Sequence, residues 1–138
     1  MKKRTFCEEV KKIIYTKGKT TYCKLDCALD IFPESEDVIL PWDMCKKLES
    51  KYKIKYTFGN QYEIHIEAAA TCQEGDTFDE KKGRTIAYSK AQRKLYYLIY
   101  RMFRDIEPYL FRYTNDALNA RKLFMRYFKR EHNFLSKL

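Results

Sequence analysis

The chain of 138 residues lacks the features that mark several large classes of protein. It has only four Gly and three Pro, and 34% of its residues are charged, which excludes collagen-like and low-complexity chains. No apolar run approaches the roughly 20 residues that a membrane-spanning helix requires. The basic start leads into residues 5–12, which contain no apolar signal-peptide core. We therefore expect one cytoplasmic domain over residues 1–138, without membrane contact.

Motifs of catalysis and nucleotide binding are also missing. The sequence contains no G-x-G-x-x-G, P-loop, G-x-S-x-G or H-E-x-x-H pattern. His65 and Glu67 have the H-x-E spacing of a zinc deaminase, but no P-C-x-x-C follows them. Asp76 and Asp79 suit the caps of a polar turn better than a catalytic pair. We expect a protein that is not an enzyme and that has no catalytic residue and no cofactor.

The five cysteines are an odd number, and only two histidines accompany them. Cys23 and Cys27 lie four residues apart, which is not the C-x-x-C spacing of common zinc ribbons. Only His65 and His132 could complete a zinc site with them. In a reducing cytoplasm such residues behave as small buried hydrophobes. We therefore expect buried thiols and no metal.

The N-terminal part of the chain combines helical and strand periodicity. Residues 5–15 have apolar side chains at helical spacing and predict a short amphipathic helix. Residues 21–31 alternate between apolar and polar side chains, which predicts a strand with one buried face. Residues 41–50 predict a second helix, with Pro in its first turn. Residues 52–58 and 62–70 alternate on either side of Gly-Asn and predict a hairpin.

The C-terminal part is helical in pattern. Residues 84–106 predict a long helix after an interruption at Gly83, and Pro108 is expected to end or kink it. Residues 116–135 predict a last helix whose inner face is Ala117, Phe124, Phe128 and Leu135. Arg121 falls on that face without explanation. The predicted fold class is α+β: a small antiparallel sheet of about three strands, including the hairpin, covered by helices, with a C-terminal helical pair.

Positive charge is concentrated at the C-terminal end. The chain has a net charge of +9, and residues 84–138 alone hold 13 basic and 4 acidic side chains, again +9. Residues 1–83, the α/β part of the domain, are neutral in sum. A basic segment of this kind attracts polyanions, of which nucleic acid is the commonest in a cytoplasm.

The basic residues recur at positions that share a helix face. At about 100° per residue, six residues of the 84–106 helix point away from Leu95, and four of the last helix point away from Phe124. Arginine suits bidentate phosphate contacts, and interleaved tyrosines are typical of base-stacking platforms and protein interfaces alike. The residues that we expect to bind nucleic acid or a partner are Lys90, Arg93, Lys94, Tyr97, Arg101, Arg104, Lys122, Arg126, Lys129 and Arg130.

Residues 72–94 carry a distinctive series: a Cys, an Asp-x-Phe-Asp, a Gly four residues later, an Ile-Ala and a basic helix. This segment resembles one in small phage and prophage accessory proteins. The resemblance implies a phage or mobile-element protein, a group that includes the anti-CRISPR inhibitors. The series from the hairpin to the Lys-rich residues 89–94 is also similar to a double-stranded-RNA-binding domain, but lacks a third strand after Ala70.

The sequence thus predicts a phage- or mobile-element-encoded, non-enzymatic protein in the host cytoplasm. We expect it to bind nucleic acid or a host ribonucleoprotein, as an inhibitor of a host defence effector such as a CRISPR complex. The alternative is a protein-interaction module without nucleic-acid contact, whose charge only confers solubility. The sequence leaves the target, the choice between RNA and DNA, and the oligomeric state open.

Overall fold

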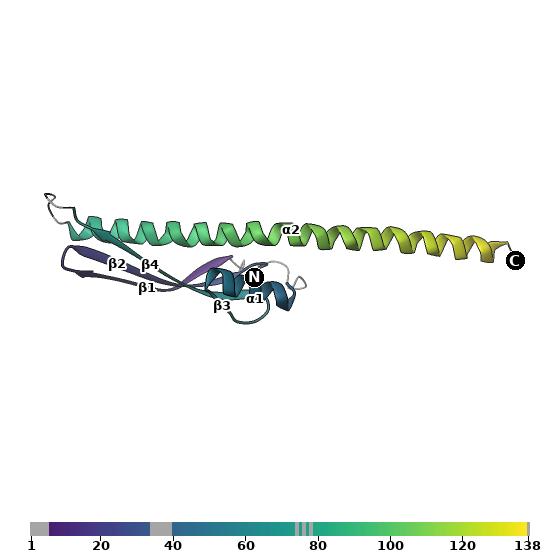
Figure 1. Cartoon of the computed structure of the whole chain (residues 1–138), viewed down its shortest axis with the longest axis horizontal. Helices are drawn as coiled ribbons and strands as arrows, with labels where there is room; N and C mark the ends of the chain where they lie inside the picture. The colour runs from purple at the N-terminus through teal and green to yellow at the C-terminus, as the bar shows by residue number, and fades with distance from the viewer. Residues whose placement is uncertain (1–5, 34–39, 74, 76, 78, 138) are drawn as a thin grey trace, which may run out of the picture. The chain divides into compact units, whose positions relative to one another are not determined.

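The computed structural model describes residues 6–33, 40–73, 75, 77 and 79–137, with the backbone alone over 112–118. The elements follow the order β1, β2, α1, β3, β4, α2, and the strands form one antiparallel sheet in the order β1-β2-β4-β3 (Figure 1). The predicted α+β class, a small antiparallel sheet covered by helices, is therefore confirmed. The chain divides into two compact units, residues 1–99 and residues 100–138, which we describe separately.

β1, Cys7–Lys17, stands where we predicted a helix over residues 5–15. It pairs with β2, Thr20–Asp30, through a turn of two residues. Gly18, the first of these, has a φ of 63°, which glycine adopts without the steric cost of a Cβ atom. The helix prediction was wrong, and the first half of the sheet is a hairpin.

The reason for the error is a β-bulge. Glu9 pairs with Cys27 and Lys11 pairs with Asp26, so that Val10 is an extra residue in β1. The extra residue breaks the period-two alternation that identifies a strand, and the apolar residues on either side of it fall at spacings that imitate a helix.

β2 has the alternation that we predicted, and it forms the middle of the core. Its inward residues, which include Cys23 and Cys27, are almost completely buried. They lie opposite inward residues of β4, Gln61–Thr71, so that Leu25 pairs with Ile66 across the two strands. The expectation that both cysteines fill the core is confirmed.

α1, Trp42–Tyr52, is the predicted second helix, and it buries Met44, Cys45 and Leu48 as expected. The helix ends at Lys53, whose φ of 54° is left-handed. This ending shortens the strand that we predicted from residue 52, and β3 consists only of Lys55–Tyr56.

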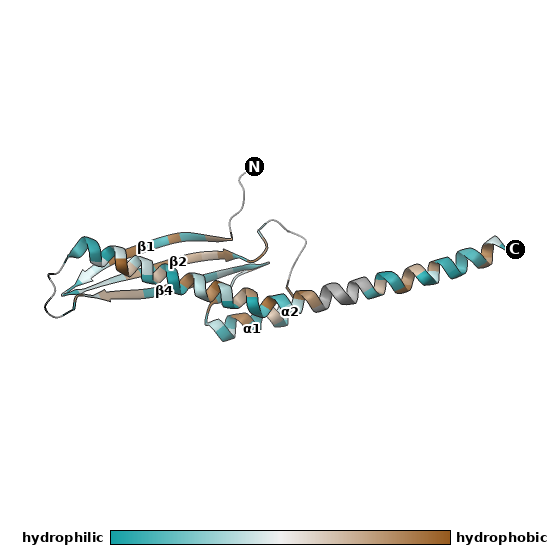
Figure 2. Ribbon diagram, turned by 90° about the horizontal axis from the view of Figure 1, so that it is seen from above, coloured by the Kyte–Doolittle hydropathy of each residue, from teal (hydrophilic) through white to brown (hydrophobic). Residues whose placement is uncertain are grey.

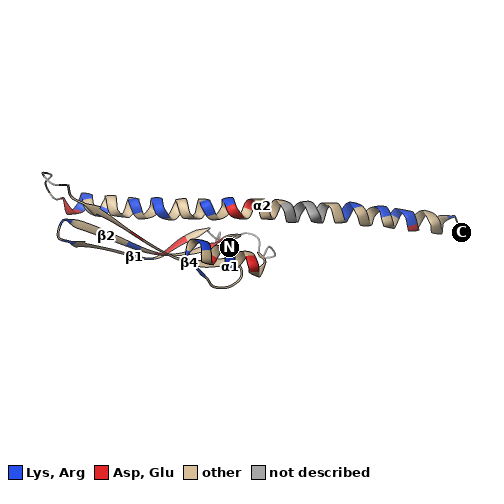
Figure 3. Cartoon of the chain, viewed as in Figure 1, with Lys and Arg blue, Asp and Glu red and all other residues tan. Residues whose placement is uncertain are grey.

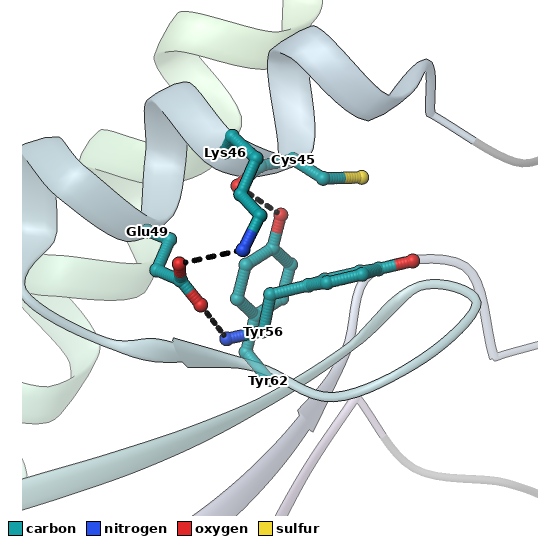
Figure 4. A network of polar contacts seen from close by, with 5 residues as sticks. All are labelled: Cys45, Lys46, Glu49, Tyr56 and Tyr62. Atoms are coloured by element: carbon teal, nitrogen blue, oxygen red, sulfur yellow. Dashed lines mark hydrogen bonds and ion pairs between the residues drawn. The ribbon is translucent and has the colours of Figure 1, made fainter.

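A polar network joins α1 to the two strands that follow it (Figure 4). Glu49 accepts hydrogen bonds from the backbone N–H of Tyr56 at 2.7 Å and from the ammonium of Lys46 at 3.1 Å. The hydroxyl of Tyr62 donates to the carbonyl of Cys45 at 3.3 Å. The Tyr56 N–H and the Lys46 ammonium hold the pKa of Glu49 below its usual range.

α2, Glu80–Ser136, contains both of the C-terminal stretches that we predicted to be helical. It continues through Gly83 and Pro108, where we expected an interruption and an end or kink. Proline removes one backbone donor, the one that would bond to the carbonyl of Arg104, but α2 is helical on both sides of it. The helical stretches are therefore joined without a loop.

The residues that we predicted on the inner faces of the two helical stretches are buried in the first stretch and exposed in the last. Ala87, Ala91 and Leu95, which belong to the first unit, are buried, and so are Met102 and Ile106, which belong to the second. Later positions that we expected to be inward are 63–66% exposed: Phe124, Phe128 and Leu135. The side chain of Ala117 lies outside the described residues. Apolar and polar residues alternate along this C-terminal part of α2 (Figure 2).

Candidate nucleic-acid interface

The first unit contains a stretch of α2 in which all charged side chains are basic. Residues 81–99 include six Lys or Arg and no Asp or Glu, and the basic positions recur along the helix (Figure 3). One side of this stretch is fixed by Ala87, Ala91 and Leu95, which are buried. Five of the basic residues occupy the remaining sides: Lys81, Lys82, Lys90, Arg93 and Lys94. Arg84 is in line with Ala91 at the start of the helix, where it is exposed.

Lys90 and Lys94, two of the predicted site residues, are bound to the edge of the sheet. Their ammonium groups donate to the backbone carbonyls of Ala69 at 3.4 Å and Glu67 at 2.9 Å. β3 is too short to reach these carbonyls, because it pairs with β4 only at Tyr62 and Glu63. An ammonium has three donors, so each lysine keeps its charge and further donors while it covers the strand edge.

Arg93 and Tyr97 project from the outer side of the same stretch. At 100° per residue they lie about 40° apart around the helix, opposite Leu95. Tyr97 is 60% exposed, and Arg93 is exposed as well. A guanidinium next to an accessible ring can contact a phosphate and a base of the same strand.

A shallow depression of about 510 Å³ lies at the start of α2. Lys19 from the β1–β2 turn, the end of β4, and Lys82 and Lys90 of α2 contribute to its lining, and Asp79 is the one acidic side chain among the described residues there. Our sequence reasoning missed Lys19 and Lys82. Lys19 directly follows Gly18 in a hairpin turn, a signal that the mistaken helix over residues 5–15 concealed.

A hydrogen bond and a cation–π contact join α2 to β1 in this unit. The hydroxyl of Tyr88 donates to the two carboxylate oxygens of Glu9 at 2.8 and 2.7 Å. The ammonium of Lys12 lies 4.4 Å from the centre of the Tyr88 ring. The hydrogen bond to the Glu9 carboxylate raises the pKa of Tyr88 to about 12. These contacts join α2 to β1, while the buried Ala87, Ala91 and Leu95 mark the side of α2 from which Arg93 and Tyr97 point away.

The second unit holds the other six predicted site residues. Arg104 is exposed and Arg101 is half-buried. The remaining four are exposed, and helix geometry places them within about 100° of one another, as we predicted: Lys122, Arg126, Lys129 and Arg130. Of these, Arg130 also binds Glu131 at 3.3 Å, and its guanidinium carbon lies 5.4 Å from the Tyr127 ring centre. This unit thus has a basic face of its own.

Neither a group of metal ligands nor a membrane-spanning helix is found in the described part of the chain. No three of its His, Cys, Asp and Glu side chains are grouped so that they could hold a metal ion. His65 instead pairs with Asp26 at 2.5 Å on the exposed side of the sheet, and Asp76 lies outside the described residues. None of the helices in the described ranges is long and apolar enough to cross a membrane.

No family model, curated protein or solved structure matches the chain. The resemblance of residues 72–94 to phage accessory proteins stays a prediction, and the function is inferred from the site.

Proposed function

We propose that the chain binds nucleic acid through basic and aromatic side chains of α2 in its first unit. We call this surface the α2 basic face and define it as Lys82, Lys90, Arg93, Lys94 and Tyr97. The observation that supports it best is the absence of any acidic residue over residues 81–99, which contain six basic side chains. Solvated helix faces in soluble proteins normally mix the two signs of charge.

Each residue type on this face has a separate part in binding. The lysines neutralise phosphates, and release of the counterions of those phosphates supplies most of the affinity. Because Lys90 and Lys94 are held against β4, they lose less side-chain freedom on binding than unattached lysines would. Arg93 offers two parallel hydrogen bonds to one phosphate, and Tyr97 offers a ring on which a base can stack.

The composition of the face favours single-stranded nucleic acid with little sequence preference. Tyr96 and Tyr97, each about 60% exposed, can stack only on bases that are not already stacked in a duplex. Asn and Gln side chains, which read base edges, are scarce: Gln92 is the one amide between residues 81 and 99, and it is half-buried.

A finer part of the proposal concerns the biological target. Residues 72–94 resemble phage accessory proteins, so we propose that the nucleic acid belongs to a host ribonucleoprotein of the defence machinery. The guide RNA of a CRISPR effector has the exposed bases and phosphates that such a face requires. A non-enzymatic protein could inhibit the effector by occupying the channel in which the guide RNA pairs with its target. Pull-down from host lysate, with and without nuclease, tests this part separately.

Binding of labelled single-stranded and duplex oligonucleotides across a salt series tests the proposal itself. For single strands the logarithm of the affinity should fall by about 0.7 per log unit of salt for each phosphate neutralised. R93E should weaken binding and flatten the slope, and Y97A should weaken binding of single strands more than of duplexes. K47E is the matched control, because Lys47 is an exposed lysine of α1, outside the α2 basic face. Equal binding by R93E and wild type, with no salt dependence, would contradict the proposal.

A protein-interaction module is the second candidate, and an apolar surface on the outer side of the sheet favours it. Ile13 and Tyr15 of β1 are about 40% exposed, and Tyr15 stacks on Tyr22 of β2 with 5.1 Å between ring centres. A protein partner on this surface should tolerate salt and be lost in Y15A. It should also remain bound after nuclease treatment, whereas a partner held by RNA should not.

A further inference from the structure

The second unit carries a stripe of large side chains that the fold leaves exposed. Phe124, Tyr127 and Phe134 are 43–66% exposed, although the 3-4 spacing that they follow with Ala120 and Glu131 is typical of helices that pair. Phe124 and Tyr127 meet edge to face with 5.9 Å between their centres, so the two rings already form one raised cluster. A surface of this kind is typical of an interaction site.

Two charged residues, Arg121 and Glu131, lie on either side of this cluster along the helix. Glu131 follows Tyr127 by four residues, and Ala120 precedes Phe124 by four residues, with Arg121 directly after it. Glu131 lies in the middle of the stripe at 100° per residue, and Arg121 lies at its margin. This pattern accounts for Arg121, whose place on an apolar face had no explanation in the sequence.

We propose that the stripe binds a second copy of the same chain, with the two helices antiparallel. If Phe124 of one copy packs on Tyr127 of the other, the spacing of four residues sets Glu131 opposite Ala120 of the second copy. The small alanine leaves room for the carboxylate, and Arg121 of the second copy lies next to it. The two-fold axis repeats the arrangement, so each dimer contains two such Glu–Arg pairs.

The same charges disfavour the other ways of covering the stripe. In a parallel pair Glu131 would lie against Glu131 of the second copy, and like charges repel at that distance. On a lipid surface the Glu131 carboxylate would enter the apolar layer at the centre of the buried face, which is costly. Within one copy Glu131 already binds Arg130 at 3.3 Å, and antiparallel self-pairing is the arrangement that adds Arg121 of the second copy to this pair.

The dimer does not depend on the proposed nucleic-acid function. Lys122, Arg126 and Lys129 lie on the side of the helix opposite Phe124, so they would remain outside the paired stripe. Each dimer would present two basic faces from its second units.

Sedimentation equilibrium of the full chain over a concentration series, after nuclease treatment, tests this inference. We expect a dimer of the wild type. R121E and E131R should each weaken association by about tenfold or more, because each leaves two like-charge contacts in the dimer. The double variant R121E/E131R should recover the wild-type affinity, since it restores both pairs with their signs exchanged. In a parallel dimer the exchange would restore nothing.

Two further measurements separate this outcome from misfolding and from lipid binding. N133R adds a positive charge to the exposed side away from Phe124 and should leave the dimer intact, while circular dichroism verifies helicity in every variant. Co-sedimentation with vesicles of anionic phospholipid probes the lipid alternative. A wild-type chain that stays monomeric at its highest soluble concentration, or that binds the vesicles as a monomer, would overturn the proposal. Failure of the double variant to recover would overturn the antiparallel register.

Discussion

A methyl group on Gly83 would lie 2.7 Å from the hydroxyl oxygen of Thr21. Thr21 is the first inward residue of β2 and is completely buried, and its hydroxyl lies 3.3 Å from that of Thr16 on β1. The absence of a side chain at Gly83 therefore allows the first turn of α2 to lie directly on the sheet. In the sequence this glycine predicts a break in the helix, whereas in the structure it is a contact point.

We predict that G83A destabilises the fold by about 1–3 kcal/mol, the usual cost of overpacking a buried site. Alanine favours a helix over glycine by about 1 kcal/mol, so a mutation without the clash would stabilise the protein. In the background of T21A the clash is relieved, and there G83A should become neutral or stabilising. Urea unfolding of the four proteins in this cycle measures the coupling. Additive effects of the two substitutions would contradict the close contact.

Much of the fold could be predicted from local patterns. The alternation of β2 and the apolar spacings of α1 and of residues 84–106 depend on which side of each element is buried, and this is periodic in the sequence. β1 could not be predicted in this way, because the bulge at Val10 breaks its period. The exposure of Phe124 and Phe128 was also unpredictable. An amphipathic pattern indicates a face that requires cover, but it does not say what covers it.

The candidate site was likewise predictable only where local patterns determine it. Helix geometry alone places Arg93 and Tyr97 on the outer side of α2, so the sequence was sufficient for them. The hydrogen bonds of Lys90 and Lys94 depend on how far β3 extends along β4, and the left-handed residue Lys53 determines that. Contacts between residues so distant in sequence leave no local signal.

The network around Glu49 predicts a contribution to stability that depends on pH. The pKa of Glu49 is lowered in the folded state, so the stability from its ionised form is present above pH 4.5 and is lost as the pH falls through the folded value. E49A should therefore unfold at lower urea than the wild type at neutral pH, and the two midpoints should converge in acid. E63A, at an exposed glutamate of β4, serves as the comparison. A difference that persists unchanged in acid would argue against the ionised hydrogen bonds.

The five thiols should react with Ellman's reagent in a definite order. Cys23, Cys27 and Cys45 are buried, whereas Cys7 and Cys72 are half-buried. Burial also raises the pKa of Cys7. We expect Cys72 to be modified first at neutral pH, and the three buried thiols to react only at the rate of unfolding. Mass spectrometry of the labelled peptides identifies the order.

The variants C23A and C27A should each lower the free energy of unfolding by on the order of 1 kcal/mol. If the purified wild-type protein contained stoichiometric zinc, and C23A or C27A lost it, the assignment of Cys23 and Cys27 to the core would be wrong.

The stability of the fold should decline in alkali, chiefly because of Cys27. Burial raises the pKa of the Cys27 thiol from its ordinary 9.0 to about 12. Between these values the unfolded chain has released the proton and the folded chain has kept it, so the unfolded state binds fewer protons and stability falls as the pH rises. For one such group the slope of the free energy of unfolding against pH approaches about 1.4 kcal/mol per pH unit.

Urea unfolding from about pH 8 to about pH 10.5 should show this decline in the wild type and in C72A, and a shallower one in C27A. Cys23, whose pKa burial also raises, contributes to the slope that remains. Parallel curves for wild type and C27A would mean that the folded protein ionises this thiol as readily as the unfolded chain does.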